Sequence, residues 1–310
     1  MKAAVIGMGY LGRFHAQKLA QSERVTLHGV ADVSADARER AQEEHDGIVV
    51  TGDYRELIDQ VDAVTVVTPT TSHFEIAKTF LEAGRHVLLE KPMTVTVAEA
   101  DELIALADAR GVVLQIGHLE RFNPATVAMA ERASGPQFFE AYRVAPFRER
   151  GIEVDVVLDL MIHDIDIVHA LTERPITDIV ANGTVVFSDK PDIVNARLQF
   201  EGGCVANLTA SRVSTKTERK IRMFQQDAYM SADLHLRYLK IATKQPPPDG
   251  EQIPKLEIEQ FEYPEHDALQ LEIDDFLNAI EGGGAPRVTG SQGRRALATA
   301  VEIGRLIGGA

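Results

Sequence analysis

A glycine-rich turn between a strand and a helix, close to the start of the chain, restricts the fold most. Residues Val5–Gly12 read V-I-G-M-G-Y-L-G, a G-x-G-x-x-G string that follows an apolar run and precedes a helical pattern. In such a turn Gly7 permits a tight bend, Gly9 lets the backbone approach a ligand, and Gly12 lets the helix pack closely on the strand. The helix N-terminus then presents free amides and a partial positive charge. The turn therefore predicts a site for the pyrophosphate of a dinucleotide.

An acidic residue follows at the spacing of a ribose ligand. Asp32 lies 20 residues beyond Gly12, at the end of the second predicted strand. Its carboxylate can accept hydrogen bonds from the ribose hydroxyls and repels a 2′-phosphate, so NAD is favoured over NADP. Arg38 weakens that preference, because a guanidinium can accommodate the extra phosphate. The alternative is a turn used only for packing, with Asp32 as a helix N-cap.

The first 118 residues alternate between β-branched runs and helical patterns. Strands are predicted at Ala3–Gly7, Val25–Asp32, Ala63–Thr68, His86–Lys91 and Val112–Gly117. Helices are predicted at Arg13–Ala20, Ala35–Glu44, Phe74–Ala83 and Val97–Ala109. This alternation indicates βαβ units and a doubly wound parallel sheet, the α/β Rossmann arrangement.

After Phe122 the pattern changes to strands with few helices between them. Strands are predicted at Ile176–Phe187, Ile193–Phe200, Cys204–Ala210, Lys220–Phe224, Tyr229–Ala232 and Leu256–Phe261, with a hairpin turn at Glu201–Gly203 and a loop at residues 245–252. Helices are predicted at Asn123–Ala133, Val156–Leu171, Ala268–Glu281 and Gly293–Ile307. We expect an α+β domain with a mostly antiparallel open sheet. The chain would then divide into an NAD-binding Rossmann domain at residues 1–120 and a substrate-binding and oligomerisation domain at residues 121–310.

The composition excludes several classes of protein. Of the 310 residues, 45% are apolar and 25% charged, as in soluble globular proteins. The net charge of −15 argues against nucleic acid or an anionic membrane as a partner. The single cysteine, Cys204, rules out an internal disulfide. With no run of membrane-spanning length and no secretory signal at the N-terminus, we expect a cytoplasmic protein.

Two further motifs carry a resemblance to a known family. Glu90-Lys91-Pro92 ends a predicted strand, and Asp159 and His163 lie four residues apart in D-L-M-I-H. Together with the glycine turn, they resemble the motifs of the Gfo/Idh/MocA oxidoreductases, and the resemblance covers essentially the whole chain. It implies NAD as the cofactor and a C-terminal domain whose open sheet often builds dimers or tetramers.

The resemblance also implies roles for single residues. Lys91 matches the family's catalytic lysine, while Asp159 and His163 match a helical pair whose histidine commonly serves as acid or base. The residues expected to bind the cofactor are Gly7, Gly9, Tyr10, Leu11, Gly12, Asp32, Arg38, Thr68, Pro69, His73, Glu90 and Lys91.

A longer stretch resembles one subgroup of the family. Gly117–Ala125 reads G-H-L-E-R-F-N-P-A, and with V-V-L-D-L-M-I-H-D-I-D-I it resembles members that oxidise the C3 hydroxyl of UDP-N-acetylglucosamine. In that subgroup the 3-keto sugar passes to a pyridoxal-phosphate aminotransferase, which makes the 3-amino sugar of lipid A. A diphosphate needs local cations in so acidic a chain, and arginine suits phosphate oxygens. The residues expected to bind substrate are His118, Arg121, Asn123, Arg148, Asp159 and His163, with Arg143, Arg150 and Arg212 as weaker candidates.

These residue types suit the oxidation of a secondary alcohol. The nicotinamide accepts the hydride, and the protein must place the alcohol and move its proton. We expect His163 to be the general base, with Asp159 orienting its ring from the same helical face. Lys91 lies at the carboxyl end of a strand and can stabilise an alkoxide, although it could also take the proton itself. A metal site at His163, Asp164 and Asp166 is not expected, because adjacent side chains on a helix point apart.

The same residues also have interpretations that involve no catalysis, or a different substrate. Lys91 could be a solvated strand-end lysine, and Asp159 and His163 an ordinary helical ion pair. The substrate could instead be an inositol, a free sugar or a UDP-sugar uronate, or the chain could be a non-catalytic module that senses NAD. Under each of these interpretations the chain binds a small molecule. The open sheet predicted in the second half indicates that a partner subunit covers its strands, and the resemblance implies a homodimer or homotetramer.

Overall fold

The computed structural model describes residues 1–147, 155–247 and 253–308. By its internal contacts the chain divides into two compact units. The first unit consists of Met1–Leu119 and Asp267–Leu297, and the second of Glu120–His266 and Ala298–Ala310. Arg148, Arg150 and most of the expected loop at residues 245–252 lie outside the described residues.

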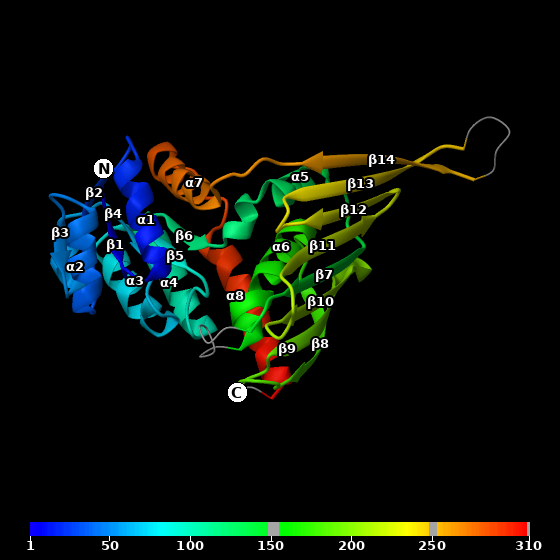
Figure 1. The fold of residues 1–310 in the computed structure, drawn as a ribbon, viewed down its shortest axis with the longest axis horizontal. Helices are drawn as coiled ribbons and strands as arrows, with labels where there is room; N and C mark the ends of the chain where they lie inside the picture. Colours follow the sequence, from blue (N-terminus) through cyan, green and yellow to red (C-terminus); the bar gives the residue numbers. More distant parts are fainter. Residues whose placement is uncertain (148–154, 248–252, 309–310) are drawn as a thin grey trace. The chain divides into compact units, whose positions relative to one another are not determined.

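The first unit holds a sheet of six parallel strands in the order β3-β2-β1-β4-β5-β6 (Figure 1). Its strands are β1 (Lys2–Ile6), β2 (Thr26–Ala31), β3 (Val49–Thr51), β4 (Ala63–Val66), β5 (His86–Glu90) and β6 (Leu114–Gly117). Its helices are α1 (Tyr10–Gln21), α2 (Ala35–Glu44), α3 (His73–Glu82), α4 (Val97–Arg110) and α7 (Ala268–Gly282), with 3-10 turns at Tyr54–Leu57 and Thr70–Ser72. A third 3-10 turn, Leu119–Phe122, begins at the last residue of the segment Met1–Leu119 and continues into the second unit. The strand order reverses between β1 and β4, and ligands of such sheets bind at that switch point.

Helices on both faces explain why the strands are apolar along their length. All four residues of β4, A-V-T-V, are buried, as a parallel sheet covered on both faces requires. Local signals fix the helix ends. In α4 the side chain of Thr96 accepts from the amide of Glu99, whose carboxylate accepts in return from the amide of Thr96, and Gly111 ends the helix at a φ of 65°. This capping box and left-handed glycine set the helix within a residue of its expected bounds.

The C-terminal part of the chain returns to the first unit. Leu269, Ile273 and Phe276 of α7 join a core that also contains Leu19 of α1, and Lys18 of α1 forms an ion pair with Asp267 at 2.5 Å. The domain boundary predicted at residue 120 places this helix in the second domain, whereas in the structure it belongs to the first unit. The local pattern predicts the helix and its apolar stripe, but the packing partner is set by contacts far apart in the sequence.

The second unit is built on an eight-stranded sheet in the order β14-β13-β12-β11-β7-β10-β9-β8. All neighbouring pairs are antiparallel except β7 and β10. The strands are β7 (Phe138–Val144), β8 (Ile176–Thr184), β9 (Ile193–Phe200), β10 (Val205–Ser211), β11 (Glu218–Gln225), β12 (Ala228–Asp233), β13 (Tyr238–Gln245) and β14 (Lys255–Glu262). The helices are α5 (Pro124–Arg132), α6 (Ile162–Thr172) and α8 (Gly290–Leu306), the last beginning in the first unit.

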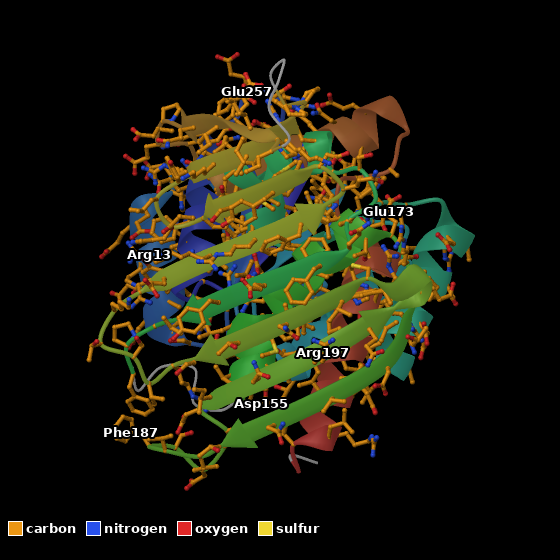
Figure 2. All side chains as sticks on the ribbon, turned by 90° about the vertical axis from the view of Figure 1, so that its right-hand side faces the viewer. Arg13, Asp155, Glu173, Phe187, Arg197 and Glu257 are labelled. Carbon is orange, nitrogen blue, oxygen red and sulfur yellow. The ribbon has the colours of Figure 1, made fainter. Side chains whose placement is uncertain are left out.

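One face of this sheet carries helices and the other is open. Helices α5 and α6 pack on the same side of the strands (Figure 1). His169 of α6 lies 2.8 Å from the hydroxyl of Thr299 in α8. The opposite face is turned toward the viewer in Figure 2, where side chains such as Arg197 stand in front of the strands. Among the described residues of this unit, no helix lies over that face.

The structure confirms the expected fold class, a parallel Rossmann sheet followed by a mostly antiparallel sheet. It also confirms the hairpin turn at Glu201–Gly203, where Gly202 and Gly203 have φ values of 78° and 85°. The sequence missed β3, β7 and β13. A π-helical turn, Val157–Met161, precedes α6 where a continuous α-helix was expected. No helix in the described ranges is both long and apolar enough to cross a bilayer.

Candidate active site

The glycine turn after β1 has the geometry that its sequence predicts. Gly7 has a φ of +96°, and a Cβ on Gly12 would lie 1.8 Å from the carbonyl oxygen of Gly7. Only glycine fits either position, because the strand, the turn and the helix touch through their backbones. At Gly9, no described atom lies within 4 Å of an added Cβ. The backbone of Gly9 is therefore open to a ligand, and the amides of α1 begin beside it.

Asp32 braces this turn from the end of β2. Its Oδ2 accepts a 2.6 Å hydrogen bond from the amide of Met8, and its Oδ1 accepts one of 2.8 Å from the amide of Ser34. Arg38 donates to the carbonyl oxygens of Asp32 and Val33 at 2.8 and 3.0 Å. The carboxylate is thus held beside the opening of the turn, where a ribose hydroxyl can share it, and the guanidinium is held beside the same loop.

The position of Asp32 gives a testable expectation for cofactor choice. Asp32→Asn removes the negative charge and keeps one acceptor oxygen for the turn. We expect the ratio of kcat/KM for NAD to that for NADP to fall by about 10- to 100-fold, because a charged hydrogen bond is worth about 1.5–3 kcal/mol. The exposed Asp36, in the first turn of α2, supplies the control Asp36→Asn, which should leave the ratio unchanged. An unchanged ratio in Asp32→Asn would remove Asp32 from cofactor selection.

Lys91 follows β5 at the carboxyl edge of the sheet and is half-buried. Its amide donates a 3.2 Å hydrogen bond to Oε2 of Glu90, and its peptide bond to Pro92 is cis. The carboxyl ends of β4 and β5 are joined through His73, whose two ring nitrogens lie 2.8 Å from the carbonyl oxygen of Thr68 and 2.9 Å from that of Pro92. Burial lowers the pKa of His73, with those carbonyls opposing the shift. His73 thus braces the loop that carries Lys91, and its expected contact with the cofactor stays a prediction.

The other expected cofactor residues lie on the same edge of the first sheet. The hydroxyl of Thr68 accepts a 2.8 Å hydrogen bond from Ser72, which fixes the turn through Pro69. Tyr10 is 66% exposed at the start of α1, next to Leu11. These side chains follow β1 and β4, the two strands of the switch point.

Asp159 and His163 lie on consecutive helical segments of the second unit. Asp159 is in the π turn, and His163 is in the first turn of α6. Both side chains are half-buried. The π turn contains Asp159, one of the residues expected to be catalytic. Such turns inside helices are frequent at functional sites. The regular i, i+4 spacing assumed from the sequence is therefore modified at this position.

The expected substrate residues that follow β6 differ in what they contact. Arg121 lies 3.4 Å from Oδ1 of Asp166, which partly neutralises its charge. Asn123 is buried and caps α5 through the amide of Ala125, while its Nδ2 donates to the carbonyl oxygen of Leu234 at 2.9 Å. His118 is 1% exposed. Of the weaker candidates, Arg212 is bound to the buried Asp192 at 2.7 Å.

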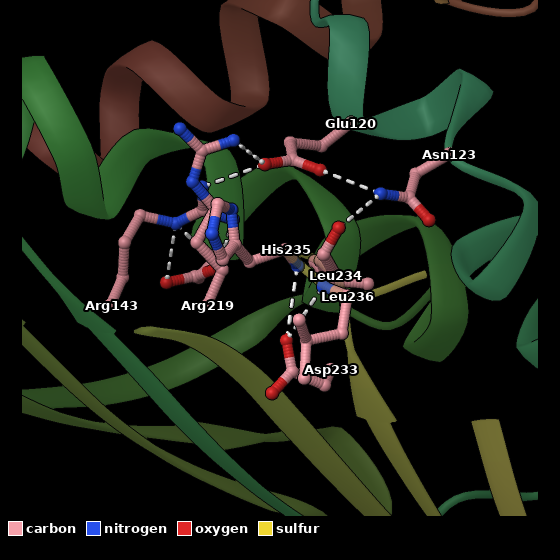
Figure 3. A network of polar contacts seen from close by, with 9 residues as sticks. Glu120, Asn123, Arg143, Arg219, Asp233, Leu234, His235 and Leu236 are labelled. Carbon is pink, nitrogen blue, oxygen red and sulfur yellow. Dashed lines mark hydrogen bonds and ion pairs between the residues drawn. The ribbon is translucent and has the colours of Figure 1, made fainter. Parts of the chain in front are cut away.

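Arg143 is the centre of a buried polar network that the sequence did not reveal (Figure 3). Its guanidinium donates to both oxygens of Asp164, at distances between 2.8 and 3.1 Å, and to Oε1 of Glu120 at 2.8 Å. Arg219 reaches Glu120 from a more exposed position at 3.2 Å. Burial would raise the pKa of Glu120, but the charges of Arg143 and Arg219 hold it below its ordinary value. Arg143 therefore ties the loop after β6 to α6, and its charge is used within the unit.

The chain matches two family models. Residues 1–118 match the oxidoreductase family with an NAD-binding Rossmann fold, and residues 136–229 match the Gfo/Idh/MocA C-terminal domain. A curated relative, the UDP-N-acetylglucosamine 3-dehydrogenase of Acidithiobacillus ferrooxidans, is 42% identical over 98% of this chain and 96% of its own length. The chain belongs to the Gfo/Idh/MocA oxidoreductase family.

Solved structures and a second relative agree with this assignment. The crystal structure of the Acidithiobacillus enzyme superposes with a TM-score of 0.91 at 39% identity, covering 99% of this chain and 97% of that one. The myo-inositol 2-dehydrogenase of Thermotoga maritima is 24% identical over 96% of this chain and 93% of its own length. Membership confirms the expected NAD cofactor and the oxidoreductase class. The glycine turn and Asp32 fit that cofactor, since they leave open backbone for its phosphates and a carboxylate for its ribose.

Proposed function

We propose that the chain oxidises the C3 hydroxyl of UDP-N-acetylglucosamine to a ketone, with NAD as the hydride acceptor. The 42% identity over 98% of the chain to a relative named for that activity carries the proposal. The family's catalytic motifs support it, because Lys91, Asp159 and His163 are all present in this sequence. The alternative explanation treats Lys91 as a solvated lysine and the other two residues as an ordinary helical ion pair. It gives no reason for all three to occur together at the positions of the family's motifs.

The roles of the proposed catalytic residues follow from their chemistry. When bound, the nicotinamide supplies the hydride acceptor. The ammonium of Lys91 donates a hydrogen bond to the reacting oxygen and stabilises the negative charge that develops there. The hydroxyl proton passes to the imidazole of His163, and the carboxylate of Asp159 favours the protonated ring. In the alternative assignment Lys91 takes the proton.

Binding of the diphosphate must depend on local cations, because the chain carries a net charge of −15. We assign this role to Arg121, whose guanidinium is held by Asp166 at 3.4 Å and is thereby oriented before an anion arrives. His118 precedes it on the segment after β6 and is assigned to the sugar. The side chain of Asn123 is instead engaged within the unit, by Ala125, Leu234 and Glu120, so its role is to position this segment. The assignment of Arg148 rests on its sequence position alone.

A panel of alcohols tests the proposed substrate. NADH formation is followed with UDP-N-acetylglucosamine, a UDP-sugar uronate, a free sugar and an inositol at equal concentrations. We expect UDP-N-acetylglucosamine to have the highest kcat/KM, by about 100-fold or more over inositol, because a site built for charged groups rejects ligands that leave them unpaired. NMR of the product should then place the new carbonyl at C3.

Two other outcomes would contradict the proposal in different ways. Turnover of an inositol or free sugar in preference to the UDP-sugar would assign the chain another activity of its family. Tight binding of NADH without turnover of any alcohol in the panel would favour a module that senses NAD.

The chemistry of the product indicates what consumes it. A 3-keto sugar is a substrate for transamination, and we assign that step to a pyridoxal-phosphate aminotransferase that supplies a 3-amino sugar for lipid A. In a coupled assay, such an aminotransferase with an amino donor should draw NAD reduction forward. Cell fractionation tests the cytoplasmic location that we propose for the enzyme.

The open face of the second sheet supports a homodimer or homotetramer. It exposes apolar side chains at several strands, with Tyr142 at 45%, Val180 at 53% and Ile258 at 51% exposure. Among them lie charged residues such as Arg222, which pairs with Glu140 across β11 and β7 at 3.2 Å. Large exposed apolar surfaces mark association sites. Sedimentation of a monomer at micromolar concentration would contradict this part of the proposal.

A further inference from the structure

Three buried titratable side chains lie together in the first unit, and one of them accepts a hydrogen bond from the backbone amide of Lys91. His15 comes from α1, Glu90 from the end of β5 and Glu272 from the middle of α7, with exposures of 0%, 6% and 0%. One nitrogen or oxygen atom of each lies within 4.8 Å of the others. Sequence patterns do not single out His15 or Glu272, because α1 and α7 lie near opposite ends of the sequence.

Glu90 has both of its carboxylate oxygens engaged. Oε1 lies 3.2 Å from Nε2 of His15, and Oε2 accepts the amide of Lys91 at 3.2 Å. A Cβ on Gly117 would lie 2.8 Å from the carboxyl carbon of Glu90, so the neighbouring strand packs tightly against this group. The orientation of the Glu90 carboxylate therefore helps to fix the position of the Lys91 backbone, whose amide donates to it.

Glu272 has the opposite environment. Neither of its carboxylate oxygens has a hydrogen-bond partner among the described residues. Gln115 of β6 lies beside it but donates to the backbone carbonyl oxygen of Glu272, at 2.9 Å, and not to the side chain. An ionised carboxylate with no partner is far too costly to bury, and such a group takes up a proton instead.

The titratable groups that face Glu272 are Glu90 from β5, His15 from α1 and Asp275 from its own helix. Burial raises the pKa of Glu272 well above its ordinary value, and the charges of Glu90 and Asp275 raise it further. A second negative charge next to Glu90 would repel that carboxylate from the positions in which His15 and the amide of Lys91 hold it.

We infer that Glu272 carries a proton in the working enzyme, and that this proton keeps the Glu90 carboxylate in place behind the backbone of Lys91. Glu272 is then a positioning residue, acting on Lys91 through Glu90. The inference rests on the proposed function only for the role of Lys91. A divalent cation held by the three side chains would be the other way to neutralise the cluster.

Infrared spectroscopy at neutral pH tests the proton without any substrate. The carbonyl stretch of a protonated carboxylic acid should be present in the wild type and lost in Glu272→Gln. Glu281→Gln is the matched control, because it removes a carboxylate from an exposed position on the same helix. The inference is overturned if Glu272→Gln removes only carboxylate bands, or if the purified enzyme releases one equivalent of a divalent cation to a chelator.

The pH dependence of turnover tests the effect on Lys91. In the wild type, ionisation of Glu272 should lower kcat on the alkaline limb, while the KM for NAD changes little. Glu272→Gln cannot ionise, so its alkaline limb should lie about one pH unit or more higher, whereas Glu281→Gln should follow the wild type. Identical limbs in all three proteins would contradict the positioning role, and the panel of alcohols tests the proposed substrate separately.

A wild-type measurement covers the case in which Glu272→Gln does not fold. The folded pKa of Glu272 lies above its unfolded value, so its contribution to stability is present below the unfolded pKa and is lost as the pH rises through the folded pKa. The acid carbonyl band of the wild type should disappear over that same alkaline interval, together with part of the thermal stability. A band that is absent at neutral pH in the wild type would overturn the inference without any variant.

Discussion

Lys91→Ala should lower kcat on the true substrate by about 100-fold or more, the usual contribution of a group that transfers or stabilises a proton. The loss should be in kcat, because the glycine turn and Asp32 remain to hold NAD. His163→Ala should have an effect of similar size. Steady-state kinetics give kcat, and fluorescence titration with NADH gives the cofactor affinity separately.

Lys78→Ala is the matched control for this prediction. Lys78 belongs to the same unit and forms an ion pair with Glu102 at 2.7 Å, so its removal tests the loss of a lysine away from the sheet edge. Its kcat should equal that of the wild type. If Lys91→Ala turned over as fast as Lys78→Ala, Lys91 would have no part in the chemistry.

Arg143→Met is expected to destabilise the protein by about 3–5 kcal/mol, the cost of leaving buried carboxylates without their partner. Asp164 and Glu120 both lose the guanidinium that they share, and both are nearly inaccessible to solvent. Urea denaturation followed by circular dichroism measures the free energy of unfolding. Destabilisation should be smaller at a pH low enough to protonate both carboxyls.

Arg305→Met provides the comparison within the same unit. Arg305 pairs with Glu302 one turn away on α8, where the two side chains are 65% and 41% exposed. Exposed ion pairs contribute about 0–1 kcal/mol, so this variant should lose little stability. Equal losses in Arg143→Met and Arg305→Met would show that burial of the network has no special energetic consequence.

The parts of the site that the sequence predicted are those set by local backbone geometry. The glycine turn needs Gly7 at positive φ and Gly12 against a carbonyl oxygen, and no other residue type can replace them there. Asp32 and Lys91 follow strands whose apolar runs are unambiguous. These features can be predicted from the sequence because each depends on a few consecutive residues.

The parts that the sequence missed depend on contacts between distant segments. β7 was missed because Arg143 is buried on the inner face of F-F-E-A-Y-R-V and so breaks the alternation of apolar and polar residues that marks a half-buried strand. Likewise, Glu272 looks like a surface residue of an amphipathic helix until α7 is placed against α1 and β5. A buried titratable residue is recognisable only once the distant segments that cover it are known.

The return of Asp267–Leu297 to the first unit has a consequence for biosynthesis. During translation, the nucleotide-binding unit cannot complete its core when β6 emerges from the ribosome, because α7 follows only after the intervening strands of the second unit. A fragment that ends after β6 would lack Ile273 and Phe276, and Leu19 would then be exposed to solvent. Fragments of that length should therefore aggregate when expressed alone, and a nascent chain would need protection until α7 arrives.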